Sequence, residues 1–410
     1  MSVHLLDSID PEILGAQLAH ARKARGLTQQ AVGDALGLAR TTIVALEKGE
    51  RRPKPGELVQ LAALYGRQVG ELVRPIALPP HESFIVQFRS ARGPHSSDRD
   101  ERREDDVRDF EALCRDYVEL ERITDSPLPR RYPEVYDTSG SDPERAAEEV
   151  ALSERNRLGL GDGPIGDLWG ILETDVGLRI FAQEFSDSRL AGLFVYTEEY
   201  GGCIAVNRKH PEERRRWSVA HEYGHFLTNR YRAEITVLQV YRRLPESERF
   251  ADGFARYFLM PSAGLIRRFE SAKRAKEGPI TPADVLTLAA LYEVSFQALM
   301  LRLEELRLIR GGSWDELREK GFKANKARAL LDLPVDSRQL RTLPRRYETL
   351  AVRAFRTGIL SQERLARFLR TDPVGARERV EELEYGQFFD NGEAYQLALD
   401  FEADLTSAGR

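Results

Sequence analysis

Residues Trp217 to Tyr231 read WSVAHEYGHFLTNRY, and the pentapeptide HEYGH inside this stretch decides how the central part of the chain folds. His221 and His225 are four residues apart, so on a helix both imidazoles lie on one face and can bind the same metal ion. Glu222 projects beside them as a candidate general base. Apolar residues on both sides of the pentapeptide are spaced to bury the opposite side of the helix. The stretch therefore predicts a helix that carries two ligands of a zinc site.

A catalytic zinc ion has three protein ligands and one open position, and in peptidases the ligands are typically two histidines and a carboxylate. The segment ESERFADGFARYFLMP, Glu246 to Pro261, is predicted to form a second amphipathic helix. Glu248 and Asp252 are four residues apart on it, so both can face the first helix. We predict that Glu248 is the third ligand, with Glu246 as its competitor. Asp252 is then suited to accept the free ring N–H of a ligating histidine.

These two motifs resemble the ImmA/IrrE family of metallopeptidases, a gluzincin-like group with the pattern HExGH followed by E-x-x-A-(N/D)-x-F-A and Leu-Met-Pro. The resemblance covers roughly Glu144 to Ile309. The matching residues are His221, Glu222, Gly224, His225, Glu248, Ala251, Asp252, Phe254, Ala255, Met260 and Pro261. In addition, Cys203 to Asn207 (CIAVN) resembles the edge strand that precedes the active-site helix in this family. Such an edge would accept an extended substrate through backbone hydrogen bonds.

The predicted chemistry is hydrolysis of a peptide bond by a zinc metalloendopeptidase. Zn²⁺ is the expected cofactor, and Mn²⁺ could replace it at such a site. Glu222 would take a proton from the attacking water and deliver it to the leaving amine. The sequence assigns no group to the oxyanion: His210, Tyr223 and Tyr231 are near in sequence, but we expect each to be structural.

A string of short helical patterns runs from Pro11 to about Pro75. Thr28 is a good N-cap for the second helix, Gly37 begins a tight turn, and a third helix is predicted from about Arg40 to Glu47. The string LTQQAVGDALGLARTTIVALEKGERRP resembles the Xre family of phage-repressor-like DNA-binding domains. This resemblance implies that the third helix enters the major groove of DNA.

The N-terminal residues of that third helix would face base edges. Arg40 and Thr41 are the predicted readers, Arg40 because a guanidinium can grip guanine through two bonds, and Val44 suits a thymine methyl. The predicted phosphate contacts are Gln29, Thr42 and Lys48. Between Asp10 and Pro75 there are ten Lys or Arg against seven Asp or Glu, a modest excess. The alternative is that the domain is kept for protein contact, because helix-turn-helix domains also pair with each other.

Bulk properties restrict the class of protein. With 410 residues the chain is too long for one ordinary core, and a net charge of −5 means that any DNA contact must come from a local patch. Cys114 and Cys203 are far apart and outside any metal spacing, so we expect no disulfide framework, which fits a reducing cytoplasm. Neither an export signal nor a membrane span is visible, so we expect no membrane partner.

Residues 78–142 are predicted to be a charged linker followed by a long helix. The mixed-charge run SSDRDERREDDVRD on its own suggests solvation or disorder. Beyond it, Val107 to Leu120 carry an apolar stripe at spacings of three and four. That helix either forms the seam of a homodimer or packs on its own peptidase domain, and packing is the default because there are too few heptads for a coiled coil.

We therefore expect a multidomain, mainly α protein with a small β-sheet. An all-α helix-turn-helix domain occupies residues 1–77, an α+β, zincin-like peptidase domain 143–310 and a helical C-terminal domain 311–410. The last is expected to be an interaction domain without chemistry, either a second helix-turn-helix-like unit or a dimerisation module. The predicted strands are the runs LRIFAQEF, LAGLFVYT and GGCIAVN.

Both resemblances together imply an endopeptidase that cleaves a helix-turn-helix transcriptional repressor, in trans or within its own chain. Cleavage would switch on stress-response, mobile-element or phage-related genes. The alternative is a DNA-binding transcription regulator whose peptidase-like domain senses a ligand or a metal and never cleaves.

Overall fold

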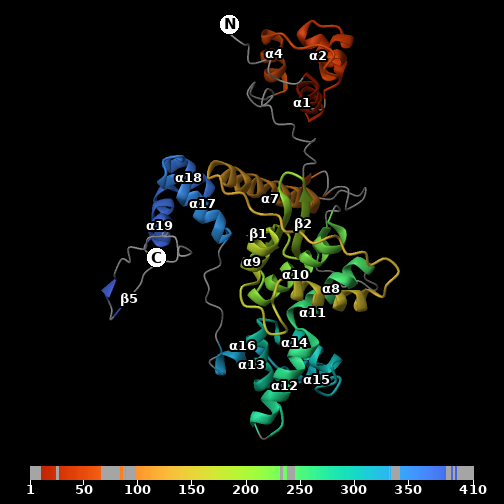
Figure 1. Cartoon of the computed structure of the whole chain (residues 1–410), viewed down its shortest axis with the longest axis vertical. Coiled ribbons are helices and arrows are strands. Elements are labelled where there is room, and N and C mark those ends of the chain that lie inside the picture. The colour runs from red at the N-terminus through yellow and green to blue at the C-terminus, as the bar shows by residue number, and fades with distance from the viewer. Residues whose placement is uncertain are drawn as a thin grey trace, which may run out of the picture. The chain divides into compact units, whose positions relative to one another are not determined.

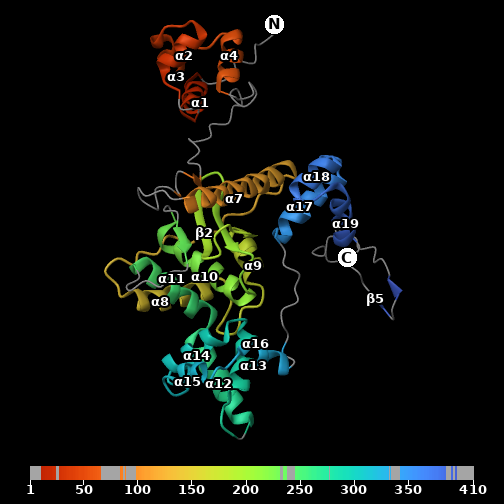
Figure 2. The same ribbon diagram turned by 180° about the vertical axis from the view of Figure 1, so that it is seen from behind.

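The chain forms two compact units, Met1–Glu82 and Ser83–Arg410. The computed structural model describes residues 11–24, 27–65, 84–85, 88, 98–230, 234–237, 245–276, 278–331, 333, 342–384, 389–390 and 393–394. Figures 1 and 2 show the described helices and strands from opposite sides.

The first unit is the predicted helix-turn-helix domain. Thr28 caps its second helix, since the Thr28 hydroxyl accepts a hydrogen bond of 3.1 Å from the Ala31 N–H. Gly37 ends that helix with a φ of 68°, a left-handed conformation that glycine adopts without strain. Leu18, Ile43 and other apolar residues are buried in a core of their own. The helices are α1 (Pro11–Ala24), α2 (Gln29–Leu36), α3 (Arg40–Glu47) and α4 (Pro55–Tyr65).

The second unit has a mixed β-sheet, which in the described part of the chain contains four strands in the order β1-β3-β2-β4. These strands are β1 (Arg179–Gln183), β2 (Leu190–Thr197), β3 (Gly201–Asn207) and β4 (Glu234–Val237). The helices around and after the sheet are α7 (Asp98–Ile123), α8 (Pro143–Arg157), α9 (Leu168–Ile171), the π-helical turn η2 (Leu172–Val176), α10 (Glu212–Asn229), α11 (Glu246–Leu259), α12 (Ser262–Lys276), α13 (Pro282–Tyr292), α14 (Phe296–Glu305), α15 (Ser313–Glu319), α16 (Ala324–Leu330), α17 (Arg345–Arg356), α18 (Gln362–Phe368) and α19 (Pro373–Glu384). A two-residue pair, β5 (Phe389–Asp390) and β6 (Glu393–Ala394), lies near the C-terminus.

The three predicted strands form, but the prediction of an edge strand at Cys203 to Asn207 is wrong. These residues belong to β3, which pairs in parallel with β1 and antiparallel with β2, so it lies inside the sheet. Every residue of β3 is buried, as expected for a strand that is covered on both faces. The described edges are β1 and β4, and β4 comes after the HEYGH helix in the sequence.

Side chains alternate between the two faces of the sheet, and each face has its own core. On one face, Ile180, Phe194 and Ile204 pack with α8, α10 and α11. On the other face, Phe181 and Leu193 pack with α7 and with α17–α19. The long helix α7 is therefore a packing element of its own unit. Of the two roles predicted for its apolar stripe, packing within its own unit is therefore the one that the structure shows.

The mixed-charge run before that stripe is helical from Asp98 onward, which corrects the expectation of disorder, whereas Asp105, Arg108 and Asp109 are exposed to solvent. Distant partners bury some of its charges. Arg103 donates a hydrogen bond of 2.5 Å to the Asp187 carboxylate, and the Asp106 carboxylate accepts hydrogen bonds from the Ser186 N–H and hydroxyl. Local composition could not reveal these partners, because they lie in the loop between β1 and β2.

The C-terminal residues are helical, as the sequence pattern predicts. Ser361 caps α18 by accepting a hydrogen bond from the Arg364 N–H, and α19 begins at Pro373. Tyr347 of α17 packs edge-on against Tyr117 of α7, with ring centroids 5.4 Å apart. No single helix of the described residues is long and apolar enough to span a membrane, whereas α13 and α14 pass such a test only as a pair, bent by 105°.

Candidate metal centre

Helix α10 presents His221 and His225 on the same side, one turn apart. It begins after Pro211 with Glu212 and Glu213 in its first turn, where carboxylates interact favourably with the helix dipole. Both histidines are buried, and their Nε2 atoms lie 3.1 Å apart. Two imidazole nitrogens therefore point at one position.

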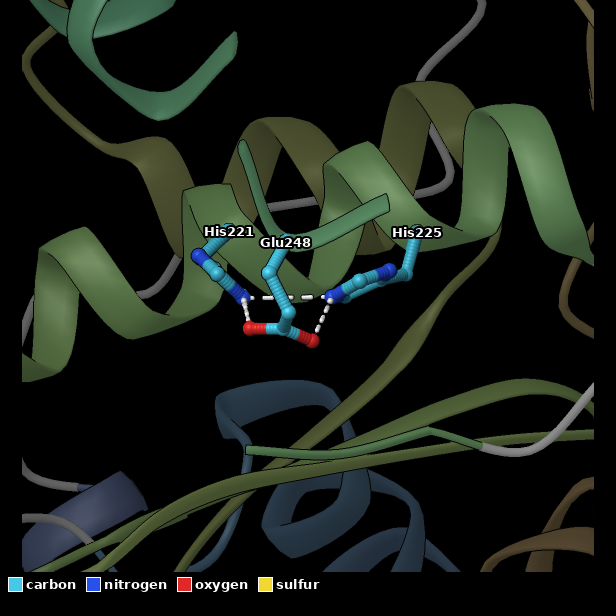
Figure 3. Close-up of side chains that lie close together, drawn as sticks. All are labelled: His221, His225 and Glu248. Carbon is cyan, nitrogen blue, oxygen red and sulfur yellow. Dashed lines mark hydrogen bonds and ion pairs between the residues drawn. The ribbon is translucent and has the colours of Figure 1, made fainter. Parts of the chain in front are cut away.

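Glu248, near the start of α11, brings a carboxylate to that position. One carboxylate oxygen lies 3.4 Å from the His221 Nε2 and the other 3.3 Å from the His225 Nε2. Figure 3 shows the carboxylate of Glu248 beneath the two rings, facing both nitrogens. Glu246, the competing candidate, is exposed and is not part of this group.

The spacing of these three groups fits a tetrahedral metal ion. Ligands about 2.0–2.2 Å from a tetrahedral zinc ion lie about 3.3–3.5 Å from one another. One ligand atom from each of His221, His225 and Glu248 lies within 4.8 Å of the others, with the closest approaches at 3.1–3.4 Å. The donor set of two imidazoles and one carboxylate is also the one that zinc prefers in peptidases.

Asp252 lies one turn after Glu248 and orients His221. Its carboxylate is 2.9 Å from the His221 Nδ1, so Nδ1 can carry the proton while Nε2 faces Glu248. Burial alone would lower the pKa of His221, but hydrogen bonds to Asp252 and Glu248 and the charge of Glu222 raise this pKa to about 10. Burial opposes ionisation of Glu248 as well, yet its hydrogen bonds to the two histidines hold its pKa well below the ordinary value. The three carboxylates make the site favourable for a cation.

Glu222 is completely buried and lies against the sheet. A Cβ atom added at Gly192 of β2 would lie only 2.3 Å from the Glu222 Oε1, so the strand backbone passes directly against this carboxylate. The pairing of β2 with β4 shifts register between Leu190 and Gly192, a bulge-like irregularity of the kind found next to active sites. Gly192 thus allows Glu222 to lie beside the histidines.

The two site helices approach closely at Gly224. A Cβ atom at that position would lie 3.2 Å from a ring carbon of Phe254 and 3.3 Å from the Ala251 Cα, tighter than ordinary van der Waals contact. The glycine of the HEYGH motif therefore lets α11 cross α10 near the candidate metal ligands, which helps Glu248 to reach the histidines.

A buried hydrogen-bond network links α10 to α8. The Tyr223 hydroxyl donates a hydrogen bond of 2.6 Å to Glu154 of α8, and both side chains are completely buried. Glu154 also pairs with Arg157 and accepts a hydrogen bond of 2.9 Å from Tyr136. The Tyr223 hydroxyl is thus bonded within the core, which agrees with the structural role predicted for it. His210 likewise has a partner, with its Nε2 2.8 Å from the Ser188 carbonyl oxygen, and Tyr231 lies outside the described residues.

The residues proposed for DNA contact lie mainly on α3. Arg40 and Thr41 are exposed at its N-terminus, and Thr42 and Val44 are half-buried. Lys48 is exposed just after the helix. Gln29, at the start of α2, donates a hydrogen bond of 2.8 Å to the Glu47 carboxylate, which also pairs with Arg22. These side chains therefore lie on or near α3. The Gln29 amide, however, already has a hydrogen-bond partner within the domain.

Two features of the site were missed in the sequence. Gly192 lies far from Glu222 along the chain, and nothing in the run LAGLFVYT distinguishes this glycine from others in strands. Glu154 is one of several acidic residues in an amphipathic helix, and only the fold shows that it is buried under Tyr223.

Comparisons with known proteins agree with this description. The model of the peptidase M78 family, described as an IrrE N-terminal-like domain, matches residues 173–304, and a helix-turn-helix domain model matches residues 13–75. The chain thus joins a helix-turn-helix domain to an IrrE-like peptidase domain. No protein of curated function matches it. The crystal structure of ComR from Streptococcus suis is similar at 12% identity over 90% of this chain and 87% of that one, but its TM-score of 0.15 is too low to support an argument.

Proposed function

We propose that this chain is a zinc-dependent endopeptidase tethered to a DNA-binding domain. The observation that supports the proposal best is the convergence of His221 and His225 from α10 with Glu248 from α11. These three residues would hold the metal ion, and Asp252 would fix the ring orientation of His221.

Glu222 would be the general base of the reaction. A zinc ion held by the three ligands supplies Lewis-acid polarisation of the scissile carbonyl and acidifies a water molecule. Glu222 would accept a proton from the attacking water and pass it to the amide nitrogen of the leaving group. Its position beside His221 and its complete burial suit this role, because a carboxylate shielded from bulk water keeps a fixed orientation.

An extended segment of the substrate would bind beside the outer edge of β4. This strand pairs with β2, which carries Gly192 against Glu222, so the β4 edge lies one strand away from the proposed base. Addition of a substrate strand there would select segments that are exposed and unfolded. The family resemblance favours a helix-turn-helix repressor as the target, in trans or within this chain, with derepression of stress, mobile-element or phage-related genes.

The first unit would direct the protein to DNA in the cytoplasm, where its operator is accessible. Arg40 and Thr41, which are exposed at the start of α3, would read base edges, and Val44 would contact a thymine methyl group. Thr42 and Lys48 would contact phosphates. Gln29 would act through Glu47 and Arg22 to position α3, because its amide is already bonded to that pair.

The decisive experiment compares the wild type with Glu222→Gln and His221→Ala in the presence of zinc, candidate repressors and DNA, with cleavage mapped by mass spectrometry. We expect Glu222→Gln to bind zinc as the wild type does and to lose cleavage, and His221→Ala to lose both. Glu248→Gln should weaken zinc binding, whereas the matched change Glu246→Gln, on the same helix but outside the ligand group, should not. Undiminished cleavage by Glu222→Gln would remove the proposed base.

Gel shifts test the DNA-binding half. Arg40→Ala and Thr41→Ala should weaken specific DNA binding, while Gln30→Ala, on an exposed face of α2, serves as the control. Unchanged specific affinity in the first two variants would show that α3 does not read bases. If zinc is bound but neither the wild type nor Glu222→Gln cleaves any candidate, the regulator that senses metal or ligand without cleavage becomes the better description.

A further inference from the structure

A cavity lies in the helical part of the second unit. It has a volume of about 430 Å³ and is bordered by α12, α13, α14, α15 and the segment between α14 and α15. None of the proposed metal ligands lines it. Pockets for small molecules occupy roughly 300–1,000 Å³, so this cavity suits a compact ligand and is too small for a folded protein segment.

The inner wall of the cavity is apolar. Phe269 of α12, Val285 of α13 and Met300 of α14 line it, and all three side chains are buried. Leu308 and Leu317 add half-buried apolar surface nearer the opening. The buried residues belong to the core that also contains α10 and α11, so this wall is part of the folded body of the unit. A hydrocarbon chain or ring would find well-ordered apolar contacts there.

The rim of the cavity is basic. Its charged residues are Lys273 on α12, Arg310 before α15, and Glu316 and Lys320 on or beside α15. Arg310 forms an ion pair with Glu316, so these two charges offset each other. In the part of the chain that the structure describes, neither Lys273 nor Lys320 has an ion-pair partner. The neighbouring acid Asp284 is already engaged by Lys276 and Thr281. Two exposed ammonium groups thus remain beside an apolar interior.

We propose that this cavity binds a small amphiphilic anion, with its hydrocarbon part against Phe269, Val285 and Met300 and its anionic head group at Lys273 and Lys320. Burial of the hydrocarbon would provide affinity, and charge-assisted hydrogen bonds at the rim would select an anion over a neutral or cationic head group. The inference is independent of the proposed peptidase activity, because it concerns different residues and is tested by binding alone.

Isothermal titration calorimetry on the full chain tests the ligand class. The probes are octanoate and octyl phosphate, which share one tail but differ in the source of the negative charge, together with octanol and octyltrimethylammonium. We expect saturable binding of at least one of the anions, at least about tenfold weaker binding of octanol, and no binding of the cation. The stronger of the two anions distinguishes a carboxylate ligand from a phosphate ester. Octanol binding as tight as that of both anions, or no saturable binding of either anion, would overturn the proposal.

Variants then locate the site. The double change Lys273→Met and Lys320→Met should weaken binding of the anion about tenfold or more and leave octanol binding unchanged, whereas Lys326→Met, an exposed lysine of α16 outside the cavity, should change neither. Met300→Trp should fill the interior of the cavity and abolish binding of both the anion and octanol. Leu317→Trp, at a half-buried position, provides the same test if Met300→Trp does not fold. Wild-type anion affinity in the lysine double variant, or in a folded tryptophan variant, would refute this location.

Discussion

Gly192 and Glu222 are in contact although they belong to different elements. A Cβ atom at position 192 would lie 2.3 Å from the Glu222 Oε1 and 3.0 Å from its Cγ, so alanine fits only if this carboxylate moves. We expect Gly192→Ala to keep zinc binding, because the proposed ligands are untouched, and to slow peptide cleavage by about a hundredfold. Zinc content and kcat/KM on the identified substrate measure the two effects.

The matched control is Gly166→Ala, since an added Cβ there meets no atom within 4 Å. It should preserve both zinc content and cleavage. Cleavage at the wild-type rate by Gly192→Ala would mean that Glu222 does not need its present position.

Glu173 is a buried carboxyl group whose ionisation opposes folding. Burial raises its pKa to about 6 from an ordinary value of 4.5, although the Tyr117 hydroxyl donates a hydrogen bond of 2.6 Å to it. Because the pKa is higher in the folded chain, its contribution to stability is complete below pH 4.5 and is lost as the pH rises through 6. Glu173→Gln should therefore stabilise the protein by about 2 kcal/mol at pH 8 and give no such gain at pH 4.5.

Urea unfolding of the wild type and the variant at the two pH values measures this difference. Glu149→Gln, at an exposed position of α8, should show no comparable dependence on pH. An equal gain for Glu173→Gln at both pH values would show that ionisation of Glu173 is not the cause.

At the residue scale, contacts between residues of one helix could be predicted from the sequence, whereas contacts between distant segments could not. The convergence of His221, His225 and Glu248 could be predicted because residues four apart share a helix face and because a catalytic zinc site needs a third protein ligand. Asp252 followed from the same spacing, and the structure brings it to 2.9 Å from the His221 Nδ1. The contact of Gly192 with Glu222 depends on the pairing of β2 with β4, which no local pattern specifies.

Among the elements, α8 and α10 are joined through the Tyr223 hydroxyl, which donates a hydrogen bond to Glu154 and accepts one of 3.1 Å from Arg157. Tyr223→Phe removes the 2.6 Å hydrogen bond to Glu154, and we expect it to lower the free energy of unfolding by about 1–3 kcal/mol, because the buried acceptor loses a donor. Tyr136→Phe removes a 2.9 Å hydrogen bond to the same carboxylate from a half-buried position, where water can replace it, so its effect should be smaller. Urea unfolding at constant zinc concentration compares them, and the reverse order would contradict this account of Glu154.

The two corrections at the element scale have a common cause. The strand β3 was expected at an edge of the sheet, and the charged run at the start of α7 was expected to be solvated or disordered. Both expectations considered one segment alone, without the distant segments that contact it. β1 pairs with the edge of β3 that faces away from β2, so β3 lies inside the sheet. Asp187 and Ser186 bind Arg103 and Asp106 of α7, whose side chains are buried. Apolar spacing predicts that an element exists, whereas its place in a sheet depends on distant segments.

At the scale of the whole molecule, the C-terminal helices share a core with one face of the sheet. Tyr347 packs against Tyr117 and Phe181, and Arg346 bonds to Glu121, which also pairs with Arg179 of β1. Helical spacing alone gave no indication of this attachment. Substitutions that destabilise α17–α19 should therefore also destabilise the peptidase domain.

The first unit has a separate core, so the two units should unfold in separate transitions. All three tryptophans, Trp169, Trp217 and Trp314, lie in the second unit, so tryptophan fluorescence reports on that unit alone, whereas calorimetry detects both. Ile43→Val should lower the melting temperature of the first unit by roughly 4–8 °C and leave the temperature of the fluorescence transition unchanged.

Leu365→Ala, in α18, should lower the temperature of the fluorescence transition by roughly 4–10 °C, because the substitution leaves a cavity in the core that packs against the sheet. If each variant moves both transitions equally, the units are not independent, and if Leu365→Ala leaves the fluorescence transition unmoved, the C-terminal helices do not stabilise the peptidase fold.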